Sequence, residues 1–127
     1  MNYEYQAYLF KRYADLFPSQ RETPSDPMYY GFECSNGWVD LIDTLLGKIA
    51  SLNPPDDFII VQVKEKMGTL RVYTENAPKN IQDLCTYYER LSAEVCEYCG
   101  EDGKLVQVDH LIKTLCPDCE EIQKLPL

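Results

Sequence analysis

Four cysteines in the C-terminal part of the chain have the spacing of a structural zinc site. Cys96 and Cys99 form one Cys-x-x-Cys pair, Cys116 and Cys119 form a second, and sixteen residues separate the two pairs. Two residues between thiolates allow a tight turn to direct both sulfurs at one ion, and Gly100 supplies permissive backbone after the first pair. We therefore predict one structural Zn²⁺ on these four soft ligands. Two disulfides or four unligated thiols are the alternatives.

The residues around the two pairs predict the elements that position the cysteines. A turn over 101–103 is followed by two short β-rich runs, 105–108 and 111–115. Pro117 stands where the first turn of a helix tolerates proline, and the acidic residues that follow favour a helix N-terminus. A cysteine turn, a hairpin and then a helix that carries two ligands is the order of a treble-clef finger, and we expect that fold at residues 96–127.

Four motifs in this order carry a resemblance to known proteins: Trp38–Ile42, Lys64–Tyr73, Cys96–Gly100 and Thr114–Cys116. Over roughly residues 30 to 120 the chain resembles a family of small zinc-binding proteins of phages and prophages. In size, acidity and cysteine pattern it is also similar to a zinc-containing member of the anti-CRISPR proteins, which inhibit type II CRISPR effector nucleases. This second resemblance implies a non-enzymatic, phage-encoded inhibitor that binds its target protein directly.

Length and composition limit the cellular setting. At 127 residues the chain is most simply one domain, with a body at 1–95 and the zinc finger as a subdomain packed on it. The N-terminus has neither a basic start nor an apolar signal core, and nothing approaches the length of a membrane span. We expect the reducing cytoplasm of a bacterial host cell, where Cys34 and Cys85 would be free thiols.

The acidity of the chain limits its possible partners, although acidity alone most often serves solubility. The formal net charge is −9, and residues 76–127 hold ten acidic and five basic residues. Because proteins bind duplex DNA through Lys and Arg, direct nucleic-acid binding is not expected. We also predict neither a membrane nor a small-molecule partner. Charge complementarity would favour a basic protein surface. The predicted contact region is the acid-rich finger, at Glu97, Glu101, Asp102, Asp118, Glu120 and Glu121.

Periodicity predicts an α+β body in which helices pack around a β-hairpin. The expected segments are a helix over 3–17, a loop over 19–28, a short extended piece over 29–32, a helix over 38–52, strands over 58–64 and 69–74, and a helix over 81–95. The expected core is Trp38, Leu41, Ile42, Leu45, Ile49, Val61, Leu70, Val72, Leu84 and Leu91. Of the ten tyrosines, we expect Tyr5, Tyr8, Tyr13 and Tyr88 to pack on apolar helix faces, and Tyr3, Tyr29 and Tyr98 to be available to a partner.

One motif argues for an enzyme. Val108–Leu111, which contains Asp109-His110, resembles the first half of an HNH endonuclease, a class that cuts DNA with a catalytic metal. His110 is the only histidine, and five residues separate it from Cys116, which leaves no room for the asparagine-bearing loop of that motif. We therefore predict no enzymatic activity and place His110 in a hairpin turn packed near the zinc. A degenerate HNH-like nuclease and an adaptor with another protein partner are the alternatives to the anti-CRISPR function.

Overall fold

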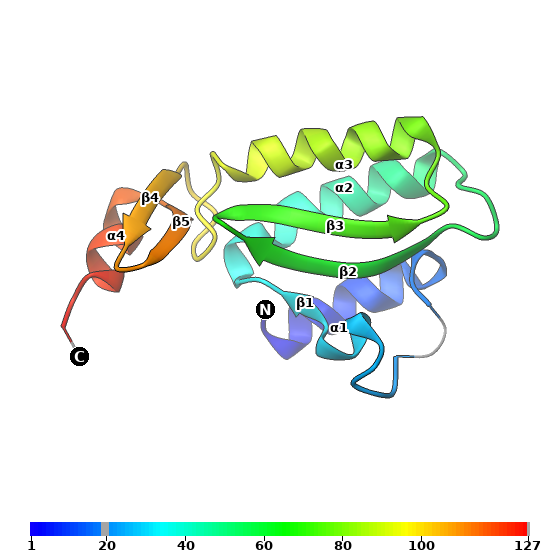
Figure 1. The fold of residues 1–127 in the computed structure, drawn as a ribbon, viewed down its shortest axis with the longest axis horizontal. Coiled ribbons are helices and arrows are strands. Elements are labelled where there is room, and N and C mark those ends of the chain that lie inside the picture. Colours follow the sequence, from blue (N-terminus) through cyan, green and yellow to red (C-terminus); the bar gives the residue numbers. More distant parts are fainter. Residues whose placement is uncertain (19–20, 127) are drawn as a thin grey trace.

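Two sheets of different size organise the chain (Figure 1). The structure is a computed structural model that describes residues 1–18 and 21–126. The larger sheet has the strand order β1-β2-β3, and the smaller one pairs β4 with β5. The elements are α1 (Tyr3–Arg12), η1 (Ala14–Leu16), η2 (Pro27–Tyr30), β1 (Phe32–Glu33), η3 (Asn36–Trp38), α2 (Val39–Ser51), β2 (Ile59–Lys66), β3 (Thr69–Glu75), α3 (Lys79–Ser92), β4 (Lys104–Val108), β5 (Leu111–Leu115) and α4 (Pro117–Gln123). The expected α+β fold class is confirmed.

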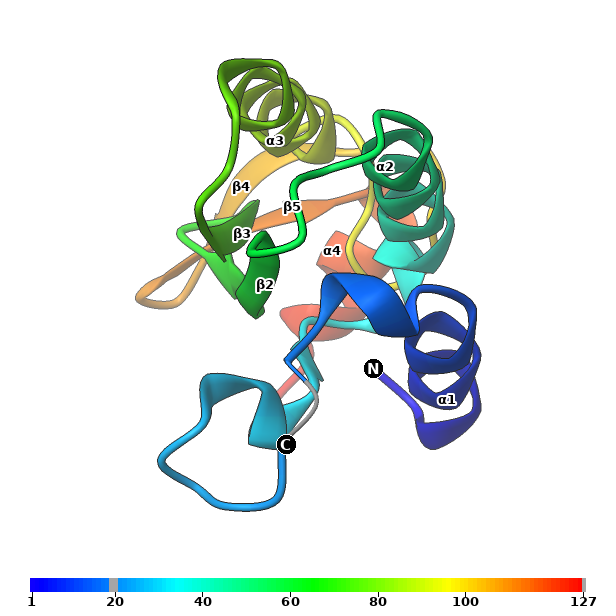
Figure 2. The same ribbon diagram turned by 90° about the vertical axis from the view of Figure 1, so that its right-hand side faces the viewer.

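The core lies between the large sheet and the helices. Figure 2 shows α2 and α3 beside one another against the β2–β3 hairpin, with α1 below α2. Four apolar residues of α2 are buried, as its periodicity predicts: Ile42, Leu45, Leu46 and Ile49. Trp38, just before α2, is 0% exposed, and its indole Nε1 donates to the Val95 carbonyl over 2.8 Å. The N-terminal end of α2 is thereby tied to the residue that precedes the first finger cysteine.

The first helix is shorter than its periodicity predicts. Asn2 caps α1 by accepting a hydrogen bond from the Tyr5 amide, and the helix ends at Arg12 instead of residue 17. Tyr13 then leaves the helical conformation, is buried, and donates its hydroxyl to the Asp43 side chain on α2. A long-range contact therefore outweighs the local helical pattern. The expected loop is described from residue 21 onward, because residues 19 and 20 lie outside the described part.

The β2–β3 hairpin has the predicted position and an unpredicted face. Met67 and Gly68 have φ of 52° and 85°, as in a two-residue type I′ turn. The register shifts between Ile60 and Gln62, which marks a β-bulge. A bulge adds one residue to one strand, so Ile60 and Val63 both face the core while Val61 turns outward. The prediction that Val61 shares a face with Val63 is therefore wrong.

The third strand of the large sheet, β1, is shorter than the extended piece expected over 29–32. The residues expected to be extended over 29–32 begin as the 3₁₀ turn η2, and only Phe32–Glu33 forms a strand, which pairs in parallel with Val63 and Lys64 of β2. Phe32 is buried against the rings of Phe10 and Phe17, with centroids 4.9 Å and 5.7 Å apart. A two-residue strand has no periodicity, so the sequence pattern could not reveal it.

Half of the predicted core is fully buried. Trp38, Ile42, Leu45, Ile49 and Leu70 lie at its centre. Leu41, Val72, Leu84 and Leu91 are partly buried and pack against its edge. Further buried side chains lie outside the predicted core, three in the regular elements α1, β2 and α3 and three in short or irregular segments: Leu9, Ile60, Ile81, Met28, Phe32 and Phe58.

One buried hydroxyl joins the edge strand β3 to the end of α3. Ser92, at the end of α3, is 0% exposed, and its Oγ accepts a hydrogen bond from the Leu70 amide over 2.8 Å. Ser92→Ala should leave that amide without a partner and lower the free energy of unfolding by about 1–3 kcal/mol. Urea unfolding measures the change. Ser51→Ala removes an exposed hydroxyl bond to Lys48 and should cost less than about 0.5 kcal/mol; equal losses for the two variants would contradict the prediction.

Candidate metal centre

The first cysteine pair lies in a tight turn directly after α3. A bridge between Val95 and Asp102 closes this turn at its base. Within the turn, Gly100 has φ of 84° and donates its amide to the Cys96 carbonyl over 3.0 Å. This left-handed conformation favours glycine and directs both thiols to the same side. Cys96 is buried at the base of the turn and Cys99 is exposed at its tip.

The second cysteine pair lies at the start of α4. β5 ends at Leu115, and Cys116 is the N-cap of the helix, with its sulfur accepting from the Cys119 amide over 3.4 Å. Pro117 is the first helical residue, as predicted, because that position needs no amide donor. The hairpin of β4 and β5 thus returns the chain from the first pair to the second.

The four thiols converge on one point. Their sulfur atoms all lie within 4.8 Å of one another, and those of Cys99 and Cys116 are 3.5 Å apart. Sulfurs about 2.3 Å from a tetrahedral zinc would be separated by about 3.8 Å, so the cluster has the right dimensions. All six cysteines are free thiols, and Cys34 and Cys85 lie outside the cluster. The four clustered cysteines could therefore hold one metal ion such as zinc.

Hydrogen bonds and burial shift the pKa values of three of the four clustered thiols. Burial opposes ionisation of Cys96, but hydrogen bonds from the backbone of Cys116, Cys99 and Tyr98 outweigh it and lower the Cys96 pKa to about 7. A backbone hydrogen bond from Glu101 favours the Cys99 thiolate, yet burial and the thiols of Cys116 and Cys96 raise the Cys99 pKa. Burial and the same neighbours raise the pKa of Cys119. A bound dication would reverse this balance, because coordinated thiols lose their protons.

A buried ion network joins the finger to the body. Glu97 follows Cys96 and is only 2% exposed. Its carboxylate lies 3.4 Å from the Lys113 ammonium and accepts from the Ser35 amide over 3.0 Å. Lys113, on β5, is also 3.3 Å from Glu65 at the end of the large sheet. Glu97 is therefore unavailable to a partner, and its assignment to the contact surface is wrong.

Backbone hydrogen bonds also join the segment after Cys96 to the body and to β5. The Gly37 amide donates to the Glu97 carbonyl over 2.7 Å, and the Glu97 amide donates to Thr114 over 2.9 Å. A Cβ at position 37 would lie 2.3 Å from the Cys96 carbonyl oxygen, so only glycine permits this approach. Thr114 donates its buried hydroxyl to Gly68 over 2.6 Å. The finger is seated directly on the body at the end of the large sheet where the β2–β3 turn lies (Figure 1).

His110 lies away from the cysteine cluster. It is exposed in the β4–β5 turn, next to Asp109 with φ of 55°. Cys116 follows the opposite end of β5, and a five-residue strand spans about 15 Å. The expectation that His110 packs near the metal is therefore wrong. Among residues 1–18 and 21–126, the cysteine cluster is the one group of metal-ligating side chains that meets these distances.

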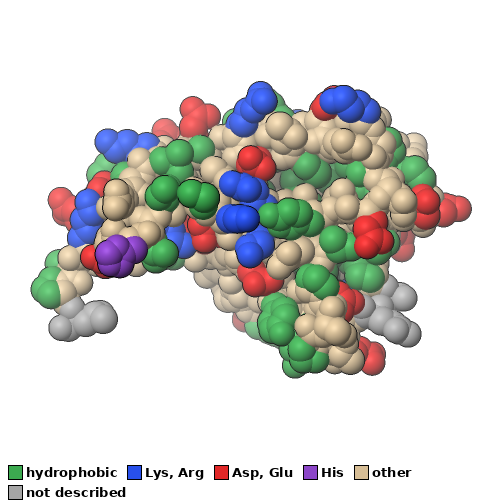
Figure 3. Space-filling model, viewed as in Figure 1, with side chains coloured by type: hydrophobic (Ala, Val, Ile, Leu, Met, Phe, Trp, Pro, Cys, Tyr) green, Lys and Arg blue, Asp and Glu red, His purple; other side chains and the backbone are tan. Residues whose placement is uncertain are grey.

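The surface charge is not uniform. Glu101, Asp102, Asp118 and Glu121 are exposed on the finger, whereas Glu120 is half-buried and pairs with Lys124 over 2.6 Å. Three cations lie on the outward face of the large sheet, where Arg71 pairs with Glu89 over 3.6 Å and Glu33 lies beside Lys64: Lys64, Lys66 and Arg71. Lys and Arg side chains accordingly gather near the middle of the face in Figure 3. A basic partner would be attracted to the exposed acids near the cysteines and not to these cations on the sheet.

The tyrosines divide differently from the prediction. Tyr13 and Tyr88 are buried as expected, but Tyr5 and Tyr8 are 41% and 44% exposed. The outward side of α1 carries both rings, because Leu9 and Tyr13 make its buried contacts. Tyr3 and Tyr29 are exposed and Tyr98 is half-buried, and their contact with a partner stays a prediction.

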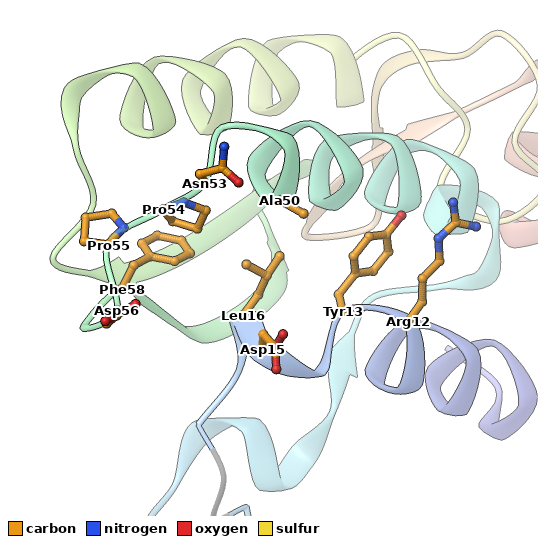
Figure 4. Close-up of a pocket in the computed structure, with 10 residues that line it drawn as sticks. All are labelled: Arg12, Tyr13, Asp15, Leu16, Ala50, Asn53, Pro54, Pro55, Asp56 and Phe58. Carbon is orange, nitrogen blue, oxygen red and sulfur yellow. The ribbon is translucent and has the colours of Figure 1, made fainter.

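One cleft in the described part of the chain lies far from the cysteines. It has a volume of about 570 Å³ and lies between the end of α1 and the α2–β2 connection (Figure 4). The Tyr13 ring and Leu16 line one side, and Phe58 and two prolines line the other. Since α2 begins beside the finger and this cleft adjoins its last turn, the cleft and the metal centre occupy opposite ends of that helix.

The fold and site define a mixed α+β protein with a C-terminal four-cysteine cluster that could hold a metal ion. The chain matches no protein-family model, no curated protein and no solved structure. In the described residues no helix combines the length and apolarity needed to cross a membrane.

Proposed function

We propose that the chain is a zinc protein whose C-terminal part is a treble-clef-like finger. Three observations support this proposal: four converging sulfurs, a cysteine turn followed by a hairpin, and a short helix whose N-cap is a ligand. Four cysteine ligands leave no open coordination position, which is typical of structural sites and unlike catalytic ones. The ion would fix the shape of the finger and perform no chemistry on a substrate.

We propose that this finger and its body form a non-enzymatic, phage-encoded inhibitor of a type II CRISPR effector nuclease. Such effectors hold guide RNA and target DNA in a positively charged channel. The observation that carries the proposal is a set of exposed carboxylates held on a finger that a buried ion network locks to the body. A rigid anionic surface is complementary to a basic one, speeds the encounter, and would occupy space that incoming DNA needs. No catalytic residue is required.

The test is binding to a guide-loaded type II effector and loss of its target-DNA loading. A triple charge reversal at Glu101, Asp102 and Glu121 should weaken both effects at least tenfold, because exposed complementary charges govern association. The matched control reverses three exposed acids at the opposite end of the body, Asp56, Asp57 and Glu75. It should change binding less than threefold.

Two results would contradict this function. The first is full DNA loading at saturating protein with no co-elution of the two proteins. The second is equal weakening by the finger and control variants, which would show a response to net charge alone. The nuclease alternative stays a prediction: the one group of metal-ligating side chains among the described residues does not include His110.

A further inference from the structure

A groove runs along α1 and the start of α2 to the first cysteine turn. It consists of two adjoining hollows of about 380 Å³ each, which share Tyr5, Val39 and Asp40. One hollow continues to Tyr8 and Asp43. The other continues along the cysteine turn to Tyr98 and Glu101. We call the whole feature the tyrosine–aspartate groove.

The side chains of this groove suit a cation with a flat face. Tyr5 and Tyr8 present half-exposed rings, and the Asp40 side chain is exposed, with no hydrogen bond or ion pair to the rest of the described chain. An aromatic face attracts a cation through its quadrupole, and a carboxylate beside it adds an ion pair. The guanidinium of arginine fits such sites better than an ammonium, because it is planar, stacks on rings and is weakly hydrated.

The protein already uses this chemistry at one end of the groove. The Arg12 guanidinium carbon lies 5.8 Å from the Tyr8 ring centroid and 5.5 Å from that of Tyr13. Arg12 also donates to the Tyr8 hydroxyl, and its Nε lies 4.0 Å from the Asp43 carboxylate. One arginine is therefore held between a tyrosine and an aspartate. The adjacent pair, Tyr5 and Asp40, has the same composition and no such cation.

We infer that the tyrosine–aspartate groove binds an arginine side chain from a basic segment of a partner protein, with Tyr5 and Asp40 as its main contacts. The inference deepens the proposed function and rests on it for the identity of the partner. Since Cys99 and Gly100 line the groove together with Tyr98 and Glu101, the metal centre shapes one of its walls. Removal of the metal should therefore weaken arginine binding as well as finger stability.

A labelled arginine hexamer, titrated with the zinc-loaded full chain, tests the inference by fluorescence anisotropy. A lysine hexamer is the comparison probe and should bind several-fold more weakly. Asp40→Asn and Tyr5→Leu should each weaken arginine binding at least fivefold. Asp118→Asn, which removes another exposed carboxylate, should change arginine binding less than twofold. Both altered groove residues are exposed, so unchanged thermal unfolding verifies that the variants are folded.

Two outcomes would overturn the inference: equal weakening by Asp40→Asn and Asp118→Asn, or equal affinity for the arginine and lysine hexamers. Either would show that the peptide responds to overall negative charge. The proposed function is judged separately with the effector. Inhibition of the effector without groove-specific peptide binding would remove the inference alone. Groove-specific peptide binding without effector inhibition would support the groove and remove the proposed partner.

Discussion

Serine in place of Cys99 should release the metal and unfold the finger. Cys99 is exposed, so the change from sulfur to oxygen costs little packing, and the loss reports coordination. A structural zinc contributes about 10–16 kcal/mol in isolated finger peptides, and we expect a loss of several kcal/mol here. Metal analysis should give one zinc per wild-type chain and less than a tenth of that for Cys99→Ser. A strong chelator should have the same effect on the wild-type protein.

Trp38 provides a local readout of this loss. It is the only tryptophan, it is buried, and its indole donates to Val95, one residue before Cys96. Unfolding of the finger should disturb this junction and shift the Trp38 emission to the red. The shift in Trp38 emission should occur at a lower urea concentration in Cys99→Ser than in the wild-type protein.

Cys85→Ser is the control for the metal experiment. Cys85 is half-buried on α3 outside the cluster, and burial raises its pKa to about 11, so it remains a neutral thiol. This variant should keep one zinc per chain and lose about 1 kcal/mol or less. Wild-type protein without metal, or Cys99→Ser with a full zinc content and wild-type stability, would contradict the assignment of the site.

Methionine in place of Lys113 should destabilise the protein by about 3–5 kcal/mol. The substitution keeps most of the side-chain volume and leaves the Glu97 carboxylate buried without its counter-ion. Breaking a buried pair from one side is costly because the remaining charge stays out of water. Glu65 loses the same cation, but it is more exposed and retains a hydrogen bond from the Gly68 amide. Chemical unfolding of the zinc-loaded protein measures the loss.

A double-mutant cycle separates loss of the pair from loss of packing. Glu97→Gln removes the charge and keeps acceptor capacity for the Ser35 amide. Combined with Lys113→Met, it should recover at least half of the lost stability, since no buried charge remains unpaired. Lys124→Met breaks the exposed pair with Glu120 and should cost less than about 0.5 kcal/mol. A double variant as unstable as the sum of the single ones would contradict the coupling.

The sequence by itself determined the features that depend on local spacing. The four-cysteine cluster follows from two residues between paired cysteines, and α2 follows from apolar residues at helical intervals. The hairpin turn at Met67 and Gly68 and the helix start at Pro117 also depend on local backbone preferences. In each case the physical cause lies within a few residues, so the feature can be predicted from the sequence without knowledge of the fold.

Only the tertiary structure decided which polar and aromatic groups are accessible. Glu97 has the sequence context of a surface acid, yet the approach of Lys113 and Ser35 from distant segments buries it. Tyr5 and Tyr8 have the spacing of a buried face, but contacts of Leu9 and Tyr13 turn α1 so that both rings face outward. Burial of a side chain depends on what packs against it from elsewhere in the chain, and local periodicity carries no information about that partner.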